Sequence, residues 1–434
     1  MSERGVGRIA VAVIVIIIII IAGASVYYAS TLGKGGTSSS SSCCTTQNSS
    51  SSTQSSSSHT TSDTLVVEEG QQPDSMDPAV EFTTPGNEIT FNVYQGLVAP
   101  DLSSNTQYVG VLAQNWTTSS DQLNWNFSLR QGVKFSNGDP FNAYVMWYSL
   151  YRTLVMNQLP AFILGQNFAN TTLANFNVSA AMLNSMSYAS PSAANLTIME
   201  SPNQSFQVLN QYEIELHVGY GYNGNVSYSA LLATLTAPCA FAVDPIVVSA
   251  NGGVVAGQKN AWMETNAVGT GFYLLNSWVQ GQSVKLVKNT NYWGNNLPAS
   301  QQNYAIEPAI LNTIIIYYKP TSTRIADLKS GFAQILGASD VTEVSSISSL
   351  TQISNVNVTT LPIQFGSANA AYFVYMNPYI VSNFSNIYVR EAIASAINYS
   401  GIINGVFGNL AQQWIGPVPP GFPFYNQTVT GLTP

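Results

Sequence analysis

The sequence is short of charged residues. Its 434 residues include 13 Lys and Arg, 21 Asp and Glu and 2 His, so 8% are charged and the formal net charge is −8. A typical soluble domain is roughly 25% charged. The few basic residues exclude a nucleic-acid-binding surface, which needs a basic face. A hydrophobic content of 45%, with 23 Tyr, 18 Phe and 7 Trp, excludes a chain that is disordered throughout.

Cysteine and histidine are also scarce. Cys43 and Cys44 lie in a serine tract and Cys239 lies in the folded part, so we expect no disulfide framework, and a bridge between two chains stays open. The one histidine after residue 62 is His217, which shares a strand face with Glu213 and Glu215. A single imidazole cannot complete a zinc site, and catalysis by a serine or cysteine nucleophile needs a base. We therefore expect no metal, no cofactor and no catalytic residues.

Two glycine-rich segments resemble nucleotide-binding loops and are rejected. Residues 219–224 match the dinucleotide pattern, but the match lies in the middle of the chain and bulky tyrosines flank its glycines. Residues 252–259 place Gln258 where a phosphate-binding loop needs lysine. A pair of carboxylates for glycoside hydrolysis stays open, because many acids lie in the folded part. These patterns favour a binding protein over an enzyme.

A long uncharged segment, residues 9–33, follows Arg4 and Arg8. About 20 apolar residues suffice to cross a bilayer. The positive charges before it place residues 1–8 in the cytoplasm and the rest of the chain outside the cell. We expect a retained membrane anchor, with a cleaved signal peptide as the alternative reading.

Residues 34–62 form the next segment, which is rich in hydroxyl side chains. Of the 26 residues from Thr37 to Ser62, 14 are Ser and 6 are Thr. Such a segment cannot bury apolar surface, so we expect a disordered stalk between the anchor and an extracellular body.

The chain also carries twelve Asn-X-Ser/Thr sequons, which mark possible sites of N-glycosylation. They are Asn48, Asn115, Asn126, Asn170, Asn177, Asn195, Asn203, Asn225, Asn357, Asn383, Asn398 and Asn426. Together with the expected anchor they predict a glycosylated protein at the cell surface.

Strand and helix patterns alternate irregularly in the body, which favours a mixed α/β fold. Residues 65–67 predict a strand, and the alternation over 123–130 predicts a half-buried strand. Asp139 and Pro140 predict the start of a helix that carries Trp147. Further predictions are a buried strand over 312–318 and a helical stretch over 390–406.

Six segments resemble, in order and spacing, motifs of the family 5 solute-binding proteins of ABC transporters, the oligopeptide and dipeptide group. They are PDSMDPA at 73–79, NVYQGLV at 92–98, LAQNW at 112–116, FSLRQGVKFSNGDPFNA at 127–143, GTGFYLLNSW at 269–278 with NYW at 291–293, and VREAI at 389–393 with AIN at 396–398. The chain departs from these motifs mostly by losing acids, as at Gln334 and Asn398.

The resemblance implies a type II periplasmic-binding-protein-like fold, with two lobes, a hinge and an extra domain inserted in the first lobe. On this basis lobe I comprises about residues 63–90 and 265–370, the inserted domain about 91–264, and the start of lobe II about 371–434. Family members continue further to complete lobe II, so we expect this part to be incomplete. Hinge closure would trap a ligand between the lobes for delivery to a membrane permease.

The resemblance also implies ligand-binding positions. In the family, peptides bind partly as an added strand. The matching positions are Glu81, Phe82, Thr83, Thr84, Tyr94, Asn369, Tyr372 and Asn377. For each of them a purely structural role is the alternative to ligand contact. Glu81 in particular could pair with a ligand amine or lie solvated. A peptide is the expected ligand, and an oligosaccharide or a purely structural surface role is the alternative.

The scarcity of charge gives one further expectation. Asp and Glu protonate below about pH 4, whereas hydroxyl and amide groups keep their polarity. We therefore expect an acid-tolerant protein of the kind carried on the surface of an acidophilic archaeon.

Overall fold

The computed structural model describes residues 63–102, 107–168, 178–202, 204–218, 231–337, 374–409 and 411–416, together with residues 350, 356, 426 and 428. The expected anchor, the stalk and the glycine pattern at 219–224 lie outside these residues. Within the described ranges, no helix combines the length and the apolar character needed to cross a membrane.

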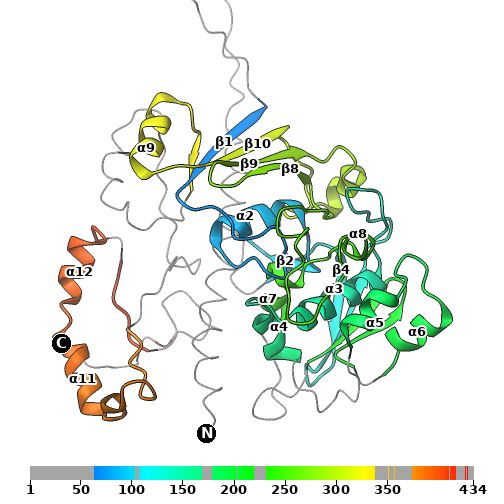
Figure 1. Ribbon diagram of the computed structural model, residues 1–434, viewed down its shortest axis with the longest axis horizontal. Helices are drawn as coiled ribbons and strands as arrows, with labels where there is room; N and C mark the ends of the chain where they lie inside the picture. Colours follow the sequence, from blue (N-terminus) through cyan, green and yellow to red (C-terminus); the bar gives the residue numbers. More distant parts are fainter. Residues whose placement is uncertain are drawn as a thin grey trace, which may run out of the picture.

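The first layer is a five-stranded mixed sheet with the order β11-β1-β10-β9-β8 (Figure 1). Its strands are β1 (Thr64–Glu69), β8 (Tyr273–Val279), β9 (Ser283–Lys288), β10 (Thr313–Tyr318) and β11 (Ile335–Leu336). β1 runs parallel to both β10 and β11, whereas β8, β9 and β10 are antiparallel neighbours. The strands predicted near residues 65–67 and 312–318 are confirmed as β1 and β10, which are neighbouring interior strands of this sheet. The expectation that the second of them is buried is wrong, because only Ile316 of β10 is buried.

A second, four-stranded antiparallel sheet has the order β4-β5-β7-β6. Its strands are β4 (Ala113–Thr118), β5 (Asn124–Leu129), β6 (Phe206–Asn210) and β7 (Glu213–His217). Ile214 and Leu216 are fully buried on one face, while Glu213, Glu215 and His217 alternate with them on the other. The predicted orientation of His217 is confirmed, and its Nε2 lies 2.8 Å from Glu215 Oε2.

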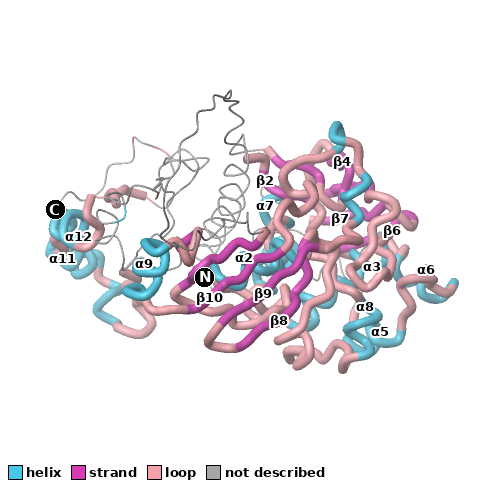
Figure 2. Tube along the Cα trace, turned by 90° about the horizontal axis from the view of Figure 1, so that it is seen from above, coloured by secondary structure: helices cyan, strands magenta, loops and turns pink. Residues whose placement is uncertain are grey.

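Short elements connect and cover the two sheets, as seen from above in Figure 2. β2 (Val98–Pro100) and β3 (Tyr108–Gly110) form a small antiparallel ribbon. The α-helices are α2 (Thr84–Val93), α3 (Ala143–Met156), α4 (Ala161–Phe168), α5 (Ala180–Ser185), α6 (Ala193–Met199), α7 (Leu231–Leu235), α8 (Pro245–Ala250), α9 (Thr321–Ser330), α11 (Ile387–Ala396) and α12 (Tyr399–Gly405). The 3-10 helices are η1 (Pro238–Ala240), η2 (Trp293–Asn296), η3 (Ala299–Gln301) and η6 (Ser382–Ser385).

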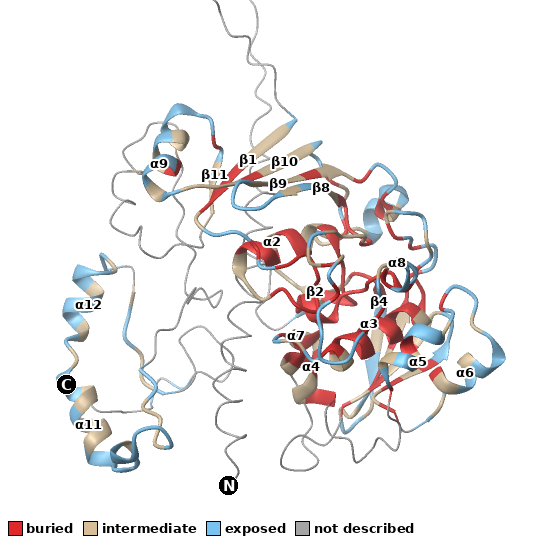
Figure 3. Cartoon of the chain, in the orientation of Figure 1, coloured by how far each residue is buried: buried red, intermediate tan, exposed pale blue. Residues whose placement is uncertain are grey.

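Burial is concentrated around α2, α3 and the elements between the sheets (Figure 3). Trp147 of α3 is fully buried and lies 4.7 Å from Tyr151, measured between ring centroids. The ring of Tyr151 contacts Phe206 of β6 edge-on, which packs α3 against the inner face of the second sheet. By contrast, no residue of α11 or α12 is buried.

Helix α3 begins later than the sequence pattern predicted. Asn142, not Asp139, is the N-cap residue, and its Oδ1 accepts a 3.0 Å hydrogen bond from Val145 N. Pro140 lies outside the helix and forms a β-bridge with Lys134, and Phe135 N donates to Asp139 O. The prediction of a cap at Asp139 is wrong because residues 134–140 close a tight turn before the helix starts.

We expect the substitution Asn142→Ala to lower the free energy of unfolding by about 1 kcal/mol, because it removes the helix cap. Asn142→Ser, which restores an accepting oxygen at this position, should recover most of the loss. Urea unfolding measures both variants. Equal stability of the alanine and serine variants would contradict the assigned cap.

Candidate functional site

The candidate site is the loop over residues 70–83, which leaves β1 and leads into α2. In open α/β sheets, ligands bind outside the carboxyl ends of the parallel strands, and this loop begins at that end of β1. Glu81 organises the loop from within. Its Oε2 accepts hydrogen bonds from Asp74 N at 2.9 Å and Ser75 N at 2.8 Å, and its Oε1 accepts from the Thr83 hydroxyl at 2.6 Å.

The structure therefore gives Glu81 a definite position. Its side chain is 1% exposed, so the expectation of a solvated carboxylate is wrong. Both carboxylate oxygens are occupied by groups of its own loop, which leaves them no open side toward a ligand amine. A Cβ at position 86 would overlap the Glu81 carboxyl group, so Gly86 is needed where α2 passes this side chain. Glu81 therefore stabilises the conformation of the loop through these hydrogen bonds.

The three residues after Glu81 are half-buried and lie at the start of α2. The ring of Phe82 contacts Phe162 of α4 edge-on at 5.8 Å between centroids. The hydroxyl of Thr83 accepts a hydrogen bond from Gly86 N and caps α2. Thr84 is the first residue of the helix. Of the predicted ligand-binding residues, Phe82, Thr83 and Thr84 are the ones that this loop brings together at a partly exposed edge.

Tyr94 lies at the other end of α2 and is buried. It is the C-cap residue, and its backbone N–H donates to Thr90 O. Burial raises the pKa of its hydroxyl far above the ordinary value, with a further contribution from Asp77 that Arg152 opposes. Tyr94 is therefore a neutral side chain of the core, and it does not lie with Thr83 and Thr84.

A buried ion pair that the sequence analysis missed joins the candidate loop to α3. Asp77 and Arg152 are 0% and 1% exposed. Arg152 Nη1 donates to Asp77 Oδ1 at 2.9 Å and Nη2 donates to Oδ2 at 2.5 Å, which makes a bidentate pair. The available signal was an arginine alone in an otherwise uncharged helix of 14 residues. Its position facing the core requires a buried acid as its partner.

The other predicted ligand-binding residues come from the last part of the chain. Asn369 and Tyr372 lie outside the described residues. Asn377 is half-buried in a turn, where its Oδ1 accepts from Tyr379 N and its carbonyl accepts from Val381 N. The resemblance to the family also implied a strand over residues 369–377. Residues 374–377 have no regular secondary structure, so this part of that expectation is wrong.

A charged group lies where β1 and β10 end. Lys319 Nζ lies 2.7 Å from Glu68 Oε1 and 2.7 Å from Asp327 Oδ2 of α9. The ammonium group also lies 4.9 Å from the centroid of the Tyr317 ring and 4.4 Å from that of Phe332. Burial raises the pKa of Glu68, although Lys319 opposes this effect. The group fixes α9 to the end of the sheet.

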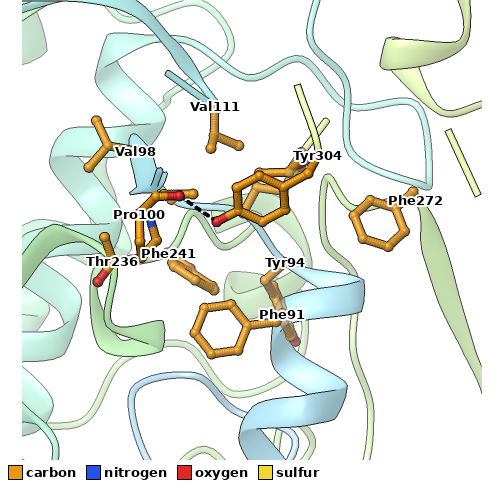
Figure 4. Close-up of a pocket in the computed structure, with 13 residues that line it drawn as sticks. Phe91, Tyr94, Val98, Pro100, Val111, Thr236, Phe241, Phe272 and Tyr304 are labelled. Carbon is orange, nitrogen blue, oxygen red and sulfur yellow. Dashed lines mark hydrogen bonds between the residues drawn. The ribbon is translucent and has the colours of Figure 1, made fainter. Parts of the chain in front are cut away.

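An apolar cavity of about 50 Å³ lies beside α2 and the small ribbon (Figure 4). The rings of Phe91, Phe241 and Tyr304 line it, and the Tyr304 hydroxyl donates to Pro100 O at 2.7 Å. Gln95, which also lines the cavity, bonds through its Nε2 to Tyr292 and through its Oε1 to Trp293. The polar groups of Tyr304 and Gln95 therefore have partners within the protein, and the cavity has room for about one methyl group or water.

We expect Val111→Ile to raise the free energy of unfolding by about 0.8 kcal/mol, because the added methyl group enters this cavity. Val248 is fully buried and does not line the cavity, so Val248→Ile should be destabilising by about 1 kcal/mol or more through overpacking. Thermal unfolding compares the two variants. Destabilisation by Val111→Ile would show that the cavity has no room for the methyl group.

The sequons are distributed over several elements. Asn115 of β4, Asn383 of η6, Asn398 and Asn426 are exposed, whereas Asn126 of β5 and Asn195 of α6 are half-buried. The other six, Asn48, Asn170, Asn177, Asn203, Asn225 and Asn357, lie outside the described residues. Asn398 also caps α12, because its Oδ1 accepts from Gly401 N.

No metal centre is found among the described residues, where no three His, Cys, Asp or Glu side chains group together in a way that could hold an ion. Cys239 is buried, and burial raises the pKa of its thiol to about 12. At neutral pH this cysteine is therefore a thiol, which is a poor nucleophile.

The chain resembles known binding proteins over most of its length. It is 25% identical over 367 residues to the probable D,D-dipeptide-binding periplasmic protein DdpA of Escherichia coli. These residues cover 84% of this chain and 58% of DdpA. The glutathione-binding protein GsiB of Salmonella typhi is 24% identical over 364 residues, which cover 83% of this chain and 57% of GsiB. The chain thus spans somewhat more than half the length of these relatives.

The fold agrees with that of solved binding proteins. The periplasmic binding protein DppA of Helicobacter pylori, solved with the peptide STSA, superposes with a TM-score of 0.57 at 21% identity, over 85% of this chain and 62% of DppA. The likeness supports the predicted α/β periplasmic-binding-protein-like fold. Residues 107–432 match the model of the bacterial extracellular solute-binding proteins, family 5. The chain belongs to this family.

Proposed function

We propose that this protein is the extracytoplasmic binding subunit of an ABC importer and that it captures dipeptides or oligopeptides for a membrane permease. The family match over residues 107–432 carries this proposal. The relatives support the ligand class, because DdpA and GsiB are named for a dipeptide and for glutathione, and DppA holds a peptide. A binding role rather than catalysis follows from the family.

The proposed lobes follow the two sheets. The five-stranded sheet combines residues 64–69 with strands between 273 and 336, whereas the four-stranded sheet uses residues 113–217 alone. This arrangement is what an inserted domain over about 91–264 would produce within lobe I. We assign the start of lobe II to about residues 371–434.

The proposed location rests on the N-terminal sequence. Residues 9–33 would anchor the chain in the membrane, and the stalk over 34–62 would keep the glycosylated body near the permease at high effective concentration. Mass spectrometry of the protein from its native membrane, with and without glycosidase, tests the anchor and the sequons together.

Titration calorimetry of the full chain tests the ligand. We expect binding heat with di- to hexapeptides and none with cello- or malto-oligosaccharides. Heat with the sugars alone would replace the peptide by the alternative ligand. The absence of heat and of a thermal shift with both panels would favour a structural surface protein.

A pair of variants at Thr84 tests whether this residue contacts the peptide. Thr84, the first residue of α2, is half-buried where the loop ends, so we expect Thr84→Ala to weaken peptide binding about three- to tenfold through loss of one hydrogen bond. Thr84→Ser keeps the hydroxyl and should bind as the wild type does. Thr118→Ala, at an exposed position of β4 outside any sequon, is the matched control for loss of a surface hydroxyl.

A further inference from the structure

The chain contains three peptide bonds in which aspartate precedes proline. They join Asp77 to Pro78, Asp139 to Pro140 and Asp244 to Pro245. Acid cleaves such a bond more readily than other peptide bonds. The aspartate side chain attacks its own carbonyl carbon, and the proline nitrogen, which belongs to a tertiary amide, accepts a proton as it leaves. In a folded chain the reaction also needs a carboxyl group that can turn toward this carbon and water that can reach the bond.

The bond after Asp77 does not meet these conditions. Asp77 is 0% exposed, and the guanidinium group of Arg152 donates a hydrogen bond to each of its carboxylate oxygens. Ala79 N donates a further hydrogen bond to Asp77 Oδ1 at 3.0 Å. Pro78 is buried as well. To attack its own carbonyl carbon, the carboxylate would have to leave the buried ion pair.

The bond after Asp244 is also protected. Asp244 is 2% exposed, and Pro245 is the first residue of α8 and is buried. Asp244 Oδ1 accepts a hydrogen bond from Ile246 N at 2.9 Å, and Oδ2 accepts one from Asn137 Nδ2 at 2.7 Å. The carbonyl oxygen of Asp244 accepts from Val248 N in the first turn of the helix. Cleavage here would break the cap and the start of α8.

The bond after Asp139 lies in an open turn. Asp139 is half-buried and Pro140 is exposed, so water reaches the bond. Asp139 Oδ2 accepts a hydrogen bond from Asn137 Nδ2, but Asn137 is itself exposed and this bond competes with water. Phe135 N donates to Asp139 O at 2.8 Å. A donor in this position stabilises the negative charge that develops on the carbonyl oxygen during the attack.

The ionisable neighbours of this turn do not block the reaction in acid. Among the described residues they are Asp244, which shares the amide donor of Asn137 with Asp139, and Lys134, whose backbone forms the β-bridge with Pro140. Burial raises the pKa of Asp244 to about 6, so its carboxyl group is neutral in acid and does not repel that of Asp139. Lys134 is exposed and forms no part of a printed-length ion pair with the carboxyl group of Asp139, which stays available for the attack.

We propose that acid cleaves the folded chain at one peptide bond, between Asp139 and Pro140. A carboxyl oxygen of Asp139 forms a bond to its own carbonyl carbon, the bond from that carbon to Pro140 N breaks, and the nitrogen takes up a proton. The products are a five-membered cyclic anhydride at Asp139 and a free amine at Pro140. One water molecule then opens the anhydride to the side-chain carboxyl group and a new C-terminal carboxyl group. This processing goes beyond transport and does not depend on the ligand.

The two products stay assembled, because each sheet contains strands from both sides of the break. β1 comes before residue 139 and lies between β10 and β11, which come after it. β5 also comes before the break and pairs with β7, which follows it. The buried ion pair of Asp77 and Arg152 joins the two products as well. In acid the protein is thus expected as two chains in one folded body, the second of which begins at Pro140.

Incubation of the full chain in acid tests the proposal. The pH is the lowest, between about 3 and 5, at which tryptophan fluorescence shows a folded protein. Mass spectrometry should find one fragment that ends at Asp139 and one that begins at Pro140. We expect them to form about tenfold or more faster than the products of cleavage after Asp77 or Asp244, which the fold protects. The two fragments should elute together from a size-exclusion column. In urea at the same pH, all three bonds should be cleaved at similar rates.

Two variants test the chemistry. Asp139→Glu keeps the carboxyl group but needs a six-membered ring, and Pro140→Ala keeps Asp139 but removes the tertiary amide. Either should slow cleavage at this position about tenfold or more, so one suffices if the other fails to fold. Pro202→Ala, at an exposed proline that follows serine, is the matched control and should be cleaved as the wild type is. The proposal is overturned if the folded wild type is not cleaved, if another bond is cleaved first, or if Pro140→Ala is cleaved at the wild-type rate. Separation of the fragments on the column would overturn their assembly.

Discussion

Replacing Arg152 with leucine is expected to lower the free energy of unfolding by about 3–5 kcal/mol. Removal of one partner of a buried ion pair leaves the other charge unpaired in the interior, and this cost falls in that range. Asp77 would be left with a buried carboxylate that loses two charge-assisted hydrogen bonds. Urea unfolding at pH 7, monitored by tryptophan fluorescence, measures the loss.

The exposed pair of Lys259 and Glu264 is the matched control. Their atoms lie 3.1 Å apart, but the side chains are 46% and 35% exposed. Lys259→Met should therefore change the stability by less than about 0.5 kcal/mol. The double variant Arg152→Leu with Asp77→Asn should regain part of the loss, because no buried charge then lacks a partner. Additive losses in the double variant would show that the two residues do not act as a pair.

Asp244→Asn is expected to stabilise the protein at neutral pH but not in acid. Asp244 caps α8 by accepting from Ile246 N, and Asn137 Nδ2 donates to both Asp244 and Asp139 at 2.7 Å. Burial, with a smaller contribution from Asp139, raises the pKa of Asp244 to about 6 from an ordinary value of 3.8.

The direction of this change in stability with pH follows from the raised pKa of Asp244. A carboxyl group that binds its proton more tightly in the folded state contributes stability that is complete below about pH 4 and is lost as the pH rises through about 6. Asparagine caps a helix as well as aspartate does and cannot ionise. The stability of Asp244→Asn relative to wild type should therefore increase by about 2 kcal/mol between pH 4 and pH 7.5.

Urea unfolding at several pH values measures how the stability of Asp244→Asn and of the wild type depends on pH. Asp121 is the control, because hydrogen bonds from Ser119 and Leu123 lower its pKa. Its carboxylate therefore adds stability at neutral pH, whereas that of Asp244 removes it. Asp121→Asn should lose stability relative to wild type at neutral pH rather than gain it. Parallel profiles for Asp244→Asn and wild type would contradict the assigned titration.

The sequence predicted those parts of the fold that depend on local periodicity. The alternation around Glu213–His217 placed each side chain on the correct face, and the apolar spacing found the helix that carries Trp147. These patterns are readable because each residue's environment depends on neighbours a few positions away. The start of α3 was misplaced because a turn competed with the cap pattern at Asp139.

The candidate site was less accessible, because its contacts join distant positions. The carboxyl group of Glu81 was expected either to pair with a ligand amine or to lie solvated, yet it accepts hydrogen bonds from the backbone amides of Asp74 and Ser75. Asp77 and Arg152 are 75 residues apart, and Asn137 and Asp244 are 107 residues apart. No periodic pattern reports such pairs, because tertiary packing alone brings the residues together.

The ion pair of Asp77 and Arg152 also has a mechanical consequence. It crosses from the loop after β1 to the long helix of the second sheet, and Thr153 on the same helix bonds to Cys239 O. Sliding these layers past each other would separate opposite charges in a medium of low dielectric constant, so the restoring force is steep. We therefore expect the two sheets to move as one rigid body.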